Sequence, residues 1–518
     1  MLMSADAYRE SLRAYSPRVY CNGEAVASVA DEERFLPGIR AVGVTYDYAL
    51  KDEYRSLMLE TQATTGKTVN RMVHINRHTE DLLSKLEAVR LICRESGCAQ
   101  RYLTHDALNA IHQATFRMDG EDGTDYHPRF LEYLHDIQER DLTLGVAMTD
   151  AKGNRALKPQ DQANPDSYVH IKERRADGIV ISGTKAIVTG GPYMHELLVM
   201  PCRTMPEGAE DFAVCCAVPI DAGGLTIIAR PAGRPGNPAA KFTAKYGQST
   251  AVCIFEDVFV PWDRVFMAGE PQHTEYLVTN YANHHRHSCI AARAGFGDLL
   301  IGAGALMVDA NGLDAGKHGH IRETMVELIK IVEGFFACGV AASVYGIEDP
   351  SGAWMPEPVF ANIGKLLLAT PIYDMHRTAH TVSGGLIVAL PGPDEDHNPA
   401  TAGDLATMLR AREDVPYQQR IDVARFVEDI TASDQGGWYS VISLHGGGSP
   451  EAMKREIFRR YPIEERKALV ERLLDRGVAE THESGAPARS KQPGQCCPVG
   501  CQAPDLPREA AANKRKAG

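Results

Sequence analysis

The amino-acid sequence predicts an α+β protein in which a helical segment, a small β domain and a second helical segment follow one another. Apolar residues recur at spacings of three and four in the first 140 residues and again after residue 275. Between these segments, short runs of β-branched residues are separated by glycines, as is typical of strands joined by turns. The composition, 44% hydrophobic and 24% charged, is that of a folded globular chain.

The first segment, residues 1–140, is expected to be mostly helical. Helical spacing is present in LMLETQATTGKTVNRMVHI (57–75) and in TEDLLSKLEAVRLICRESG (79–97). Thr79-Glu80-Asp81 is a plausible helix start, because acidic groups are favoured at the positive end of the helix dipole. Gly97 is expected to end that helix, since glycine adopts the left-handed conformation common at helix C-termini.

Residues 141–275 read as the β domain. Asp177-Gly178 between two β-branched runs is a hairpin signal. The pattern continues in HELLVMPCRT, DFAVCCAVPI, GLTIIARPA and AVCIFEDVFVPWDRVF, which gives at least six short strands. Such a set predicts a small barrel or sandwich.

Residues 276–475 are predicted to form a helical bundle. AGFGDLLIGAGALMVDANGLD and IRETMVELIKIVEGFFACGVAASVYG are apolar nearly all round. Such helices are either buried inside one subunit or pressed against another, and the sequence leaves both alternatives open. The tail, 476–518, is rich in Pro, Gly, Ala and charge and is expected to be disordered. Its Cys496, Cys497 and Cys501 offer three sulfurs, fewer than a closed four-ligand metal site needs.

Composition excludes several classes of function. The net charge of −13 argues against nucleic-acid binding. No apolar run reaches the roughly 18 residues of a membrane span, and MLMSADAYRESLRAYSPR lacks the apolar core of a signal peptide. The 12 cysteines are scattered, unlike a secreted disulfide framework. We therefore expect a reduced, cytoplasmic protein. The chain also lacks GxxxxGK[ST], GxGxxG after a strand, GxSxG and HExxH, which weakens the nucleotide-hydrolase, Rossmann, serine-esterase and zincin interpretations.

Two stretches of the β domain suit a bound cofactor. AMTDAKGNR (147–155) combines the Thr149 hydroxyl with the cations Lys152 and Arg155 in a loop, which fits a pyrophosphate or a flavin edge and equally an ordinary turn. GTKAIVTGGPYMHE (183–196) places Thr189 before two glycines, where a ligand contact and a plain strand turn are equally plausible.

Three helical stretches carry further candidates. On a helix, His285 and Cys289 of YANHHRHSCIAARAGFGD (281–298) share a face, as a metal pair or as a core histidine beside an apolar cysteine. Cys98 and Tyr102 have the same spacing. The glycines of HTVSGGLIVALPG (380–392) and LHGGGSPE (444–451) allow backbone to approach a ligand or another helix.

Read together, these stretches resemble the 4-hydroxyphenylacetate 3-hydroxylase superfamily, and within it the 4-hydroxybutyryl-CoA dehydratase/vinylacetyl-CoA Δ-isomerase branch. The resemblance runs to about residue 475 and includes TGKTVNR, TDYHPRF, AMTDAKGNR, DGIVISGTKAIVTG, FEDVFVPWDRVF, HHRHS, GGLIVALP and HGGGSP. It implies an acyl-CoA dehydrogenase-like fold, FAD in a groove near the β domain, and a homotetramer.

The iron–sulfur ligands of that branch are only half present. The dehydratase holds a [4Fe–4S] cluster with three cysteines and one histidine. Cys98 and His285 match two of these ligands, whereas Tyr102 and Ala292 stand where the other two cysteines would be. Because such clusters need thiolate sulfur, we expect no cluster and no other metal here. A remodelled site using Cys289, one helical turn away, is the alternative.

Other family positions are kept or changed one by one. Gln100, Thr189 and His285 match as they stand, whereas a family lysine appears as Arg293, a tyrosine as Cys289 and a glutamate as Thr250. The hydroxylase branch has an Arg-x3-Tyr pair and a flavin-loop histidine, and these fall at Leu103, Ala107 and Asp150. Neither branch's full set of catalytic groups is therefore present.

The resemblance implies an FAD-dependent enzyme of dehydratase/isomerase descent that acts on a CoA thioester or similar acyl substrate. His285 would remove a proton made acidic by the thioester, while Gln100, Thr189 and Arg293 orient the substrate or flavin. The flavin contacts expected from the matching stretches are Met148, Thr149, Lys152, Arg155, Lys185, Thr189, Gly384, Gly385 and Gly446. The main alternative is a monooxygenase that receives reduced FAD from a separate reductase and hydroxylates a phenol. A dehydratase with a remodelled iron site and a non-catalytic subunit are the remaining alternatives.

Overall fold

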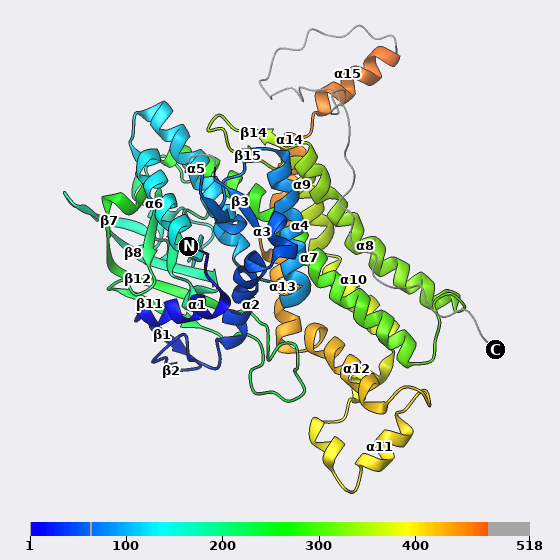
Figure 1. Cartoon of the computed structure of the whole chain (residues 1–518). Coiled ribbons are helices and arrows are strands. Elements are labelled where there is room, and N and C mark those ends of the chain that lie inside the picture. The colour runs from blue at the N-terminus through cyan, green and yellow to red at the C-terminus, as the bar shows by residue number, and fades with distance from the viewer. Residues whose placement is uncertain (1, 63–64, 475–518) are drawn as a thin grey trace. The chain divides into compact units, whose positions relative to one another are not determined.

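The computed structural model describes residues 2–62 and 65–474 (Figure 1). Contacts divide the chain into two units, Met1–Tyr461 and Pro462–Gly518. The described part of the second unit is the helix α15 (Ile463–Leu473). The tail with Cys496, Cys497 and Cys501 lies outside the described residues.

The N-terminal part of the first unit is mostly helical, as predicted, but it also contributes strands. Its strand β1 pairs in parallel with β11 of the β domain and so extends the larger sheet. The elements are α1 (Ala5–Ser11), β1 (Arg18–Cys21), β2 (Glu24–Ala25), α2 (Leu36–Asp47), α3 (Arg55–Met58), β3 (Leu59–Thr61), β4 (Thr68–Asn70), α4 (Thr79–Ser96), α5 (Tyr102–Asp122) and α6 (Tyr126–Arg140).

The helix predicted over residues 57–75 is wrong. The chain forms the short helix α3 and then the antiparallel hairpin β3–β4, whose register joins Leu59 to Asn70. Gly66 has φ +65° beside the second strand, a conformation that side chains other than glycine rarely adopt. The threonines and the valine around it favour strand over helix, and this local preference overrides the apolar spacing.

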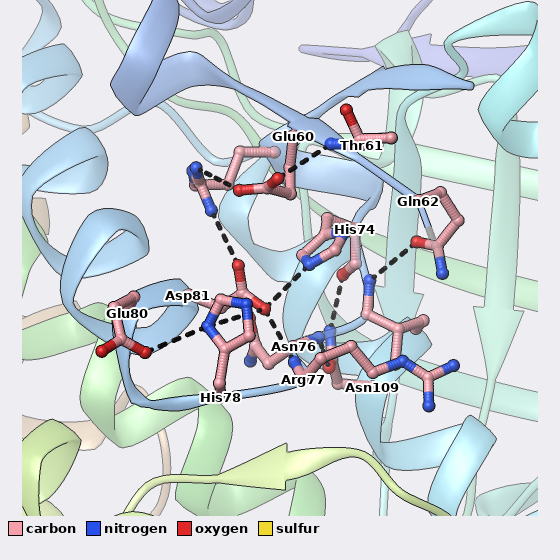
Figure 2. Close-up of polar contacts among 12 residues, drawn as sticks. Glu60, Thr61, Gln62, His74, Asn76, Arg77, His78, Glu80, Asp81 and Asn109 are labelled. Atoms are coloured by element: carbon pink, nitrogen blue, oxygen red, sulfur yellow. Dashed lines mark hydrogen bonds and ion pairs between the residues drawn. The ribbon is translucent and has the colours of Figure 1, made fainter. Parts of the chain in front are cut away.

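Helix α4 begins at Thr79 and ends before Gly97, as the sequence predicts. Asp81 of its first turn is buried, and its carboxylate accepts from the Arg77 backbone N–H at 2.7 Å and pairs with the His74 ring at 3.1 Å (Figure 2). Arg71 bonds both Asp81 and Glu60 of β3. The acidic helix start therefore also fastens the hairpin β3–β4 to α4.

The β domain contains two sheets built from antiparallel neighbours, apart from the parallel pairs β1–β11 and β5–β9. The larger sheet has the order β2-β1-β11-β12-β8-β6, with β7 also paired to β8, and the smaller has the order β13-β10-β9-β5. The hairpin expected at Asp177-Gly178 is confirmed, because β7 and β8 pair across it. The strands are β5 (Leu144–Ala147), β6 (Thr149–Asp150), β7 (His170–Arg174), β8 (Gly178–Thr189), β9 (Glu196–Val199), β10 (Val214–Pro219), β11 (Leu225–Ala229), β12 (Thr250–Pro261) and β13 (Val265–Ala268).

The C-terminal helices pack around α7, which runs for 40 residues beside α4, α5, α8, α9 and α10 (Figure 1). By length and composition α7 could cross a membrane, but 61% of its apolar window is buried within the protein, as in a core helix. Helix α8 instead leaves Val326 and Ile329 exposed. The elements are α7 (Pro271–Ala310), α8 (Gly319–Val344), β14 (Ile347–Glu348), β15 (Trp354–Met355), α9 (Pro358–Ala369), α10 (Ile372–Ser383), α11 (Ala402–Met408), α12 (Tyr417–Thr431), α13 (Asp434–His445) and α14 (Pro450–Arg460).

Helices α4 and α7 approach closely at Gly295. A Cβ added there would lie 2.5 Å from the Arg90 carbonyl oxygen and 2.8 Å from the Cys93 Cβ. We expect Gly295→Ala to lower the free energy of unfolding by about 1–3 kcal/mol, because backbone atoms must shift to admit the methyl group.

Gly302→Ala is the matched control on the same helix, because its Cβ would have no neighbour within 4 Å. It should leave the free energy of unfolding unchanged or raise it by up to about 1 kcal/mol, since alanine favours a helix over glycine. Urea unfolding of both variants measures this. Equal stability of the two variants would contradict the close contact.

Candidate active site

A cavity of about 40 Å³ lies where helices α5, α7, α9 and α13 meet the end of strand β8. It lies in the first unit. Its wall is formed by Cys98, Tyr102, Leu103, Thr189, Gln248, His285, Cys289, Ala292, Arg293, Lys365, Leu368, Ile442, Ser443 and Gly446. The wall thus contains two thiols, an imidazole and two cations, which is an unusual density of reactive groups for so small a space.

One face of α7 supplies the central groups. Tyr281, His285, Cys289 and Arg293 follow at intervals of four residues, so they stack along one side of the helix. The rings of Tyr281 and His285 are stacked at 5.4 Å and 13°, and Tyr102 of α5 stacks on His285 at 6.2 Å and 21°. Both aromatic rings therefore lie nearly parallel to the imidazole.

Both nitrogens of His285 are engaged. Nδ1 lies 3.2 Å from Oδ2 of Asp106 on α5, and Nε2 lies 3.5 Å from the sulfur of Cys289. The predicted common face of His285 and Cys289 is therefore confirmed. Asp106, His285 and Cys289 form a carboxylate–imidazole–thiol series that ends at the cavity wall.

The environment favours charge separation within this series. Burial alone would lower the pKa of His285, but the neighbouring Cys289 sulfur and the Asp106 carboxylate raise it to about 9. Burial alone would raise the pKa of Cys289, but the charge of His285 lowers it below its ordinary value. The two shifts together favour an imidazolium beside a thiolate over a neutral imidazole beside a thiol.

The Asp106 carboxylate is itself completely buried and is held by polar groups from three helices. Oδ1 accepts from the Ser288 hydroxyl at 2.7 Å and lies 3.5 Å from the Lys85 ammonium of α4. Burial raises its pKa, but Lys85, His105 and His285 outweigh that effect and hold the pKa well below its ordinary value. Asp106 therefore remains a carboxylate and can orient His285.

Two cations complete the wall. Arg293 donates from Nε to the Ser443 hydroxyl at 2.5 Å, and Lys365 of α9 donates to the Ser443 carbonyl at 2.6 Å. Within the described residues, Nη1 of Arg293 is buried without a hydrogen-bond partner. Burial lowers the pKa of Lys365 to about 8. The cavity is thus prepared for an anionic or strongly polar group.

The donor set at the cavity does not fit a cubane cluster held by three cysteines and a histidine. The Cys98 sulfur lies 3.2 Å from the Tyr102 hydroxyl, His285 already pairs with Cys289, and Ala292 supplies no ligand. Across residues 2–62 and 65–474, no group of three or more His, Cys, Asp or Glu side chains is placed to hold a metal ion.

The structure brings together some of the predicted site residues. His285, Thr189, Arg293, Gly446 and Cys98 all reach the cavity wall. Thr189 is the last residue of β8 and pairs with Thr250 of β12. The end of a strand therefore contributes to a cavity whose other walls are mostly helical. Gln100 has φ +31° and accepts from the Tyr193 hydroxyl at 2.9 Å, away from the wall itself.

The remaining predicted flavin contacts lie outside the cavity wall. Lys185 is buried and pairs with Asp150 at 2.7 Å, and it also donates to the carbonyls of Met148 and Met200. Thr149 belongs to β6, and Lys152 donates its backbone N–H to Ser167. The positions on the surface are Arg155, Gly384 and Gly385.

Sequence reasoning missed Asp106, Lys365 and Ser443 as site residues. Asp106 and Lys365 each carried a signal, since a charge inside an otherwise apolar helical run must be buried with a partner. Ser443 carried none, because a serine near a helix end has many ordinary roles.

The comparisons with known proteins agree with this architecture. A family model described as 4-hydroxyphenylacetate 3-hydroxylase N terminal matches residues 4–267, and its C-terminal counterpart matches residues 274–475. The chain is 35% identical over 487 residues to 4-hydroxybutyryl-CoA dehydratase/vinylacetyl-CoA-Δ-isomerase from Clostridium aminobutyricum, covering 90% of this chain and 98% of that protein.

Two solved structures share the fold. An oxygen-tolerant archaeal 4-hydroxybutyryl-CoA dehydratase from N. maritimus superposes with a TM-score of 0.89 at 34% identity, covering 94% of this chain and 97% of that one. The oxygenase component of 4-hydroxyphenylacetate 3-monooxygenase in complex with FAD superposes with a TM-score of 0.81 at 22% identity, covering 91% and 98%. The chain therefore belongs to the 4-hydroxyphenylacetate 3-hydroxylase family. Its known relatives are enzymes.

Removal of the Lys85 charge tests the buried ion pair. Lys85→Met removes one of the two buried cations that face the Asp106 carboxylate, Lys85 and His285, so the free energy of unfolding should fall by about 3–5 kcal/mol. Lys330→Met is the control, because the Lys330–Glu327 pair on α8 is exposed and should change stability by less than about 1 kcal/mol. Urea unfolding distinguishes them, and a Lys85→Met protein as stable as the unaltered one would refute the role of this pair.

Replacement of Cys289 tests the imidazolium–thiolate pair. Cys289→Ala removes the negative charge that raises the pKa of His285, so that pKa should fall from about 9 toward its ordinary value near 6.5. NMR titration of histidine-labelled protein measures it directly. Cys253→Ala on β12 is the control and should leave the titration unchanged. A His285 signal that titrates below pH 6.5 in the unaltered protein would overturn the assignment.

Proposed function

We propose that this chain is an FAD-dependent enzyme of dehydratase/isomerase descent that acts on a CoA thioester or a similar acyl substrate, without a [4Fe–4S] cluster. The observation that carries the proposal is the series Asp106–His285–Cys289 at the cavity wall. It supplies a proton donor and a proton acceptor side by side, as a proton shift along an acyl chain needs. The 35% identity to the dehydratase/isomerase supports the acyl-CoA substrate class.

In this proposal His285 and Cys289 divide the acid–base work. The raised pKa of His285 makes it the proton donor, and the Cys289 sulfur is the acceptor for a proton from the carbon next to the thioester. From the sequence, removal of the substrate proton was assigned to His285. With a pKa of about 9, however, the imidazole is already protonated at neutral pH and cannot accept a further proton. Arg293 and Lys365 face the same cavity and would stabilise negative charge on the thioester oxygen.

The chain offers groups that fit a flavin. Nε2 of Gln100 is a buried donor without a partner among the described residues, and a flavin edge presents acceptors for such a donor. Thr189 adds a hydroxyl at the cavity wall. When bound, FAD would supply the electron acceptor and donor that side chains lack. The FAD complex of the related oxygenase component supports this assignment.

The proposal also includes an acyl-CoA dehydrogenase-like domain layout, a homotetramer and a cytoplasmic location. Leu306, Val326, Ile329 and Leu367 on α7, α8 and α9 are exposed, and apolar side chains on neighbouring helices are typical of subunit contacts. The second candidate is a monooxygenase served by a flavin reductase. It is disfavoured because Leu103 stands at the cavity wall where the resemblance places the arginine of the hydroxylase branch.

The test begins with anaerobic purification followed by an absorption spectrum and an iron assay on the same sample. We expect a flavin spectrum without iron or acid-labile sulfide. Butyryl-CoA in D₂O should then exchange its α-hydrogen for deuterium without oxygen, as followed by NMR. His285→Gln should slow this exchange about a hundredfold, because it removes the proton donor. His320→Gln, an exposed position on α8, is the control.

Three outcomes would contradict the proposal. Iron with acid-labile sulfide would restore a dehydratase with a remodelled cluster. Product formation that needs both oxygen and a reductase would establish the monooxygenase. Absence of flavin would remove the catalytic role assigned to it.

A further inference from the structure

The cavity contains every part of a nucleophilic centre, although the proposed proton shift needs only some of them. Cys289 presents its sulfur at the cavity wall, His285 lies 3.5 Å behind it, and Asp106 holds the far ring nitrogen at 3.2 Å. A nucleophile, a base and a group that orients the base recur in this order in enzymes that form covalent intermediates.

The base is rigidly placed. The imidazole stacks with the rings of Tyr281 and Tyr102, and both of its nitrogens have partners. Its Asp106 anchor is fixed by Ser288 and Lys85. Because Asp106 occupies Nδ1, Nε2 is the ring nitrogen left to contact the Cys289 sulfur.

An electrophilic partner for such a sulfur would find stabilisation in the same cavity. Arg293 lies one helical turn beyond Cys289, and its Nη1 atom is buried with no hydrogen-bond partner among the described residues. An unpaired buried guanidinium nitrogen is costly unless something binds it. A carbonyl oxygen that gains negative charge during attack by the sulfur is a fitting acceptor.

We propose that Cys289 is an acyl acceptor, which takes the acyl group of a thioester onto its sulfur. His285 holds the proton that the leaving thiolate takes up, and Arg293 is the oxyanion donor. This inference goes beyond the proton shift proposed above and rests on it only for the substrate class, an acyl thioester.

The step balances as a thioester exchange. In the charge-separated pair the Cys289 proton already lies on Nε2 of His285, and the sulfur attacks the carbonyl carbon. A new carbon–sulfur bond forms to Cys289, the bond to the CoA sulfur breaks, and the leaving CoA thiolate takes the proton from His285. No oxidant or reductant is involved, because one thioester replaces another.

The experiment uses the purified full-length protein with acetyl-CoA as the probe. We expect one acetyl group per chain by intact-protein mass spectrometry, mapped to Cys289 by peptide analysis and released by hydroxylamine. Cys289→Ser should not be labelled at this position with hydroxylamine-sensitive acetyl. Cys338→Ser is the matched control, because Cys338 is a half-buried thiol on α8 outside the cavity wall. This variant should be acetylated on Cys289 to the same extent as the unaltered protein.

Two further variants test the roles of the neighbours. His285→Gln should slow labelling about a hundredfold, because it removes the charge that favours the Cys289 thiolate and the proton donor to the leaving group. Arg293→Met should slow labelling by a similar factor, about a hundredfold or more, as expected for loss of an oxyanion donor. If either variant fails to fold, the comparison of Cys289 with Cys338 inside the unaltered protein still decides the proposal.

Absence of acetyl on Cys289 in the unaltered protein would overturn the inference, as would equal labelling of Cys289 and Cys338. The proposed function fails separately. A protein that binds flavin and exchanges the α-hydrogen of butyryl-CoA but forms no adduct would refute the acyl acceptor alone. An adduct on Cys289 in a protein without flavin would support the acyl acceptor and refute the FAD enzyme.

Discussion

The buried carboxylate of Asp106 is the group on which the rest of the site depends. It lies on α5, pairs with Lys85 of α4, and contacts Ser288 and His285 of α7. A buried charge is tolerated only where partners surround it, so these three helices must meet in one arrangement for Asp106 to be satisfied. The same contacts that join the helices also set the orientation and the protonation of His285.

Other elements of the fold place further reactive side chains at the same cavity. The long helix α7 stacks Tyr281, His285, Cys289 and Arg293 along one face, and close packing at Gly295 holds it against α4. Strand β8 ends at Thr189, and α9 and α13 deliver Lys365 and Ser443. Five positions differ from the dehydratase pattern that the sequence resembles. Four of them line the cavity, namely Cys289, Arg293, Tyr102 and Ala292, and Thr250 pairs with Thr189 of the wall. The chain thus keeps the family's framework and alters the chemistry inside it.

Local patterns in the sequence were reliable where short-range physics decides the structure. The acidic start of α4 and its end at Gly97, the hairpin at Asp177-Gly178 and the shared face of His285 and Cys289 all follow from neighbours within a few residues. The helix prediction for residues 57–75 was wrong because two local signals disagreed there. Apolar spacing indicated a helix, but β-branched residues and Gly66 formed a hairpin. The strands β1 and β2 were missed because β1 pairs with β11, about 200 residues away.

The sequence by itself determined the family, the order of helical and β segments, and the residue types that could do chemistry. Only the tertiary structure decided which of them meet. Lys85, Asp106, His285 and Lys365 come from four separate helices, and their charges matter to one another only because burial removes water from between them. Lys185, by contrast, contacts Asp150 and two backbone carbonyls, because its buried charge also needs polar partners. Proximity and desolvation are properties of the folded chain, so no local pattern could assign them.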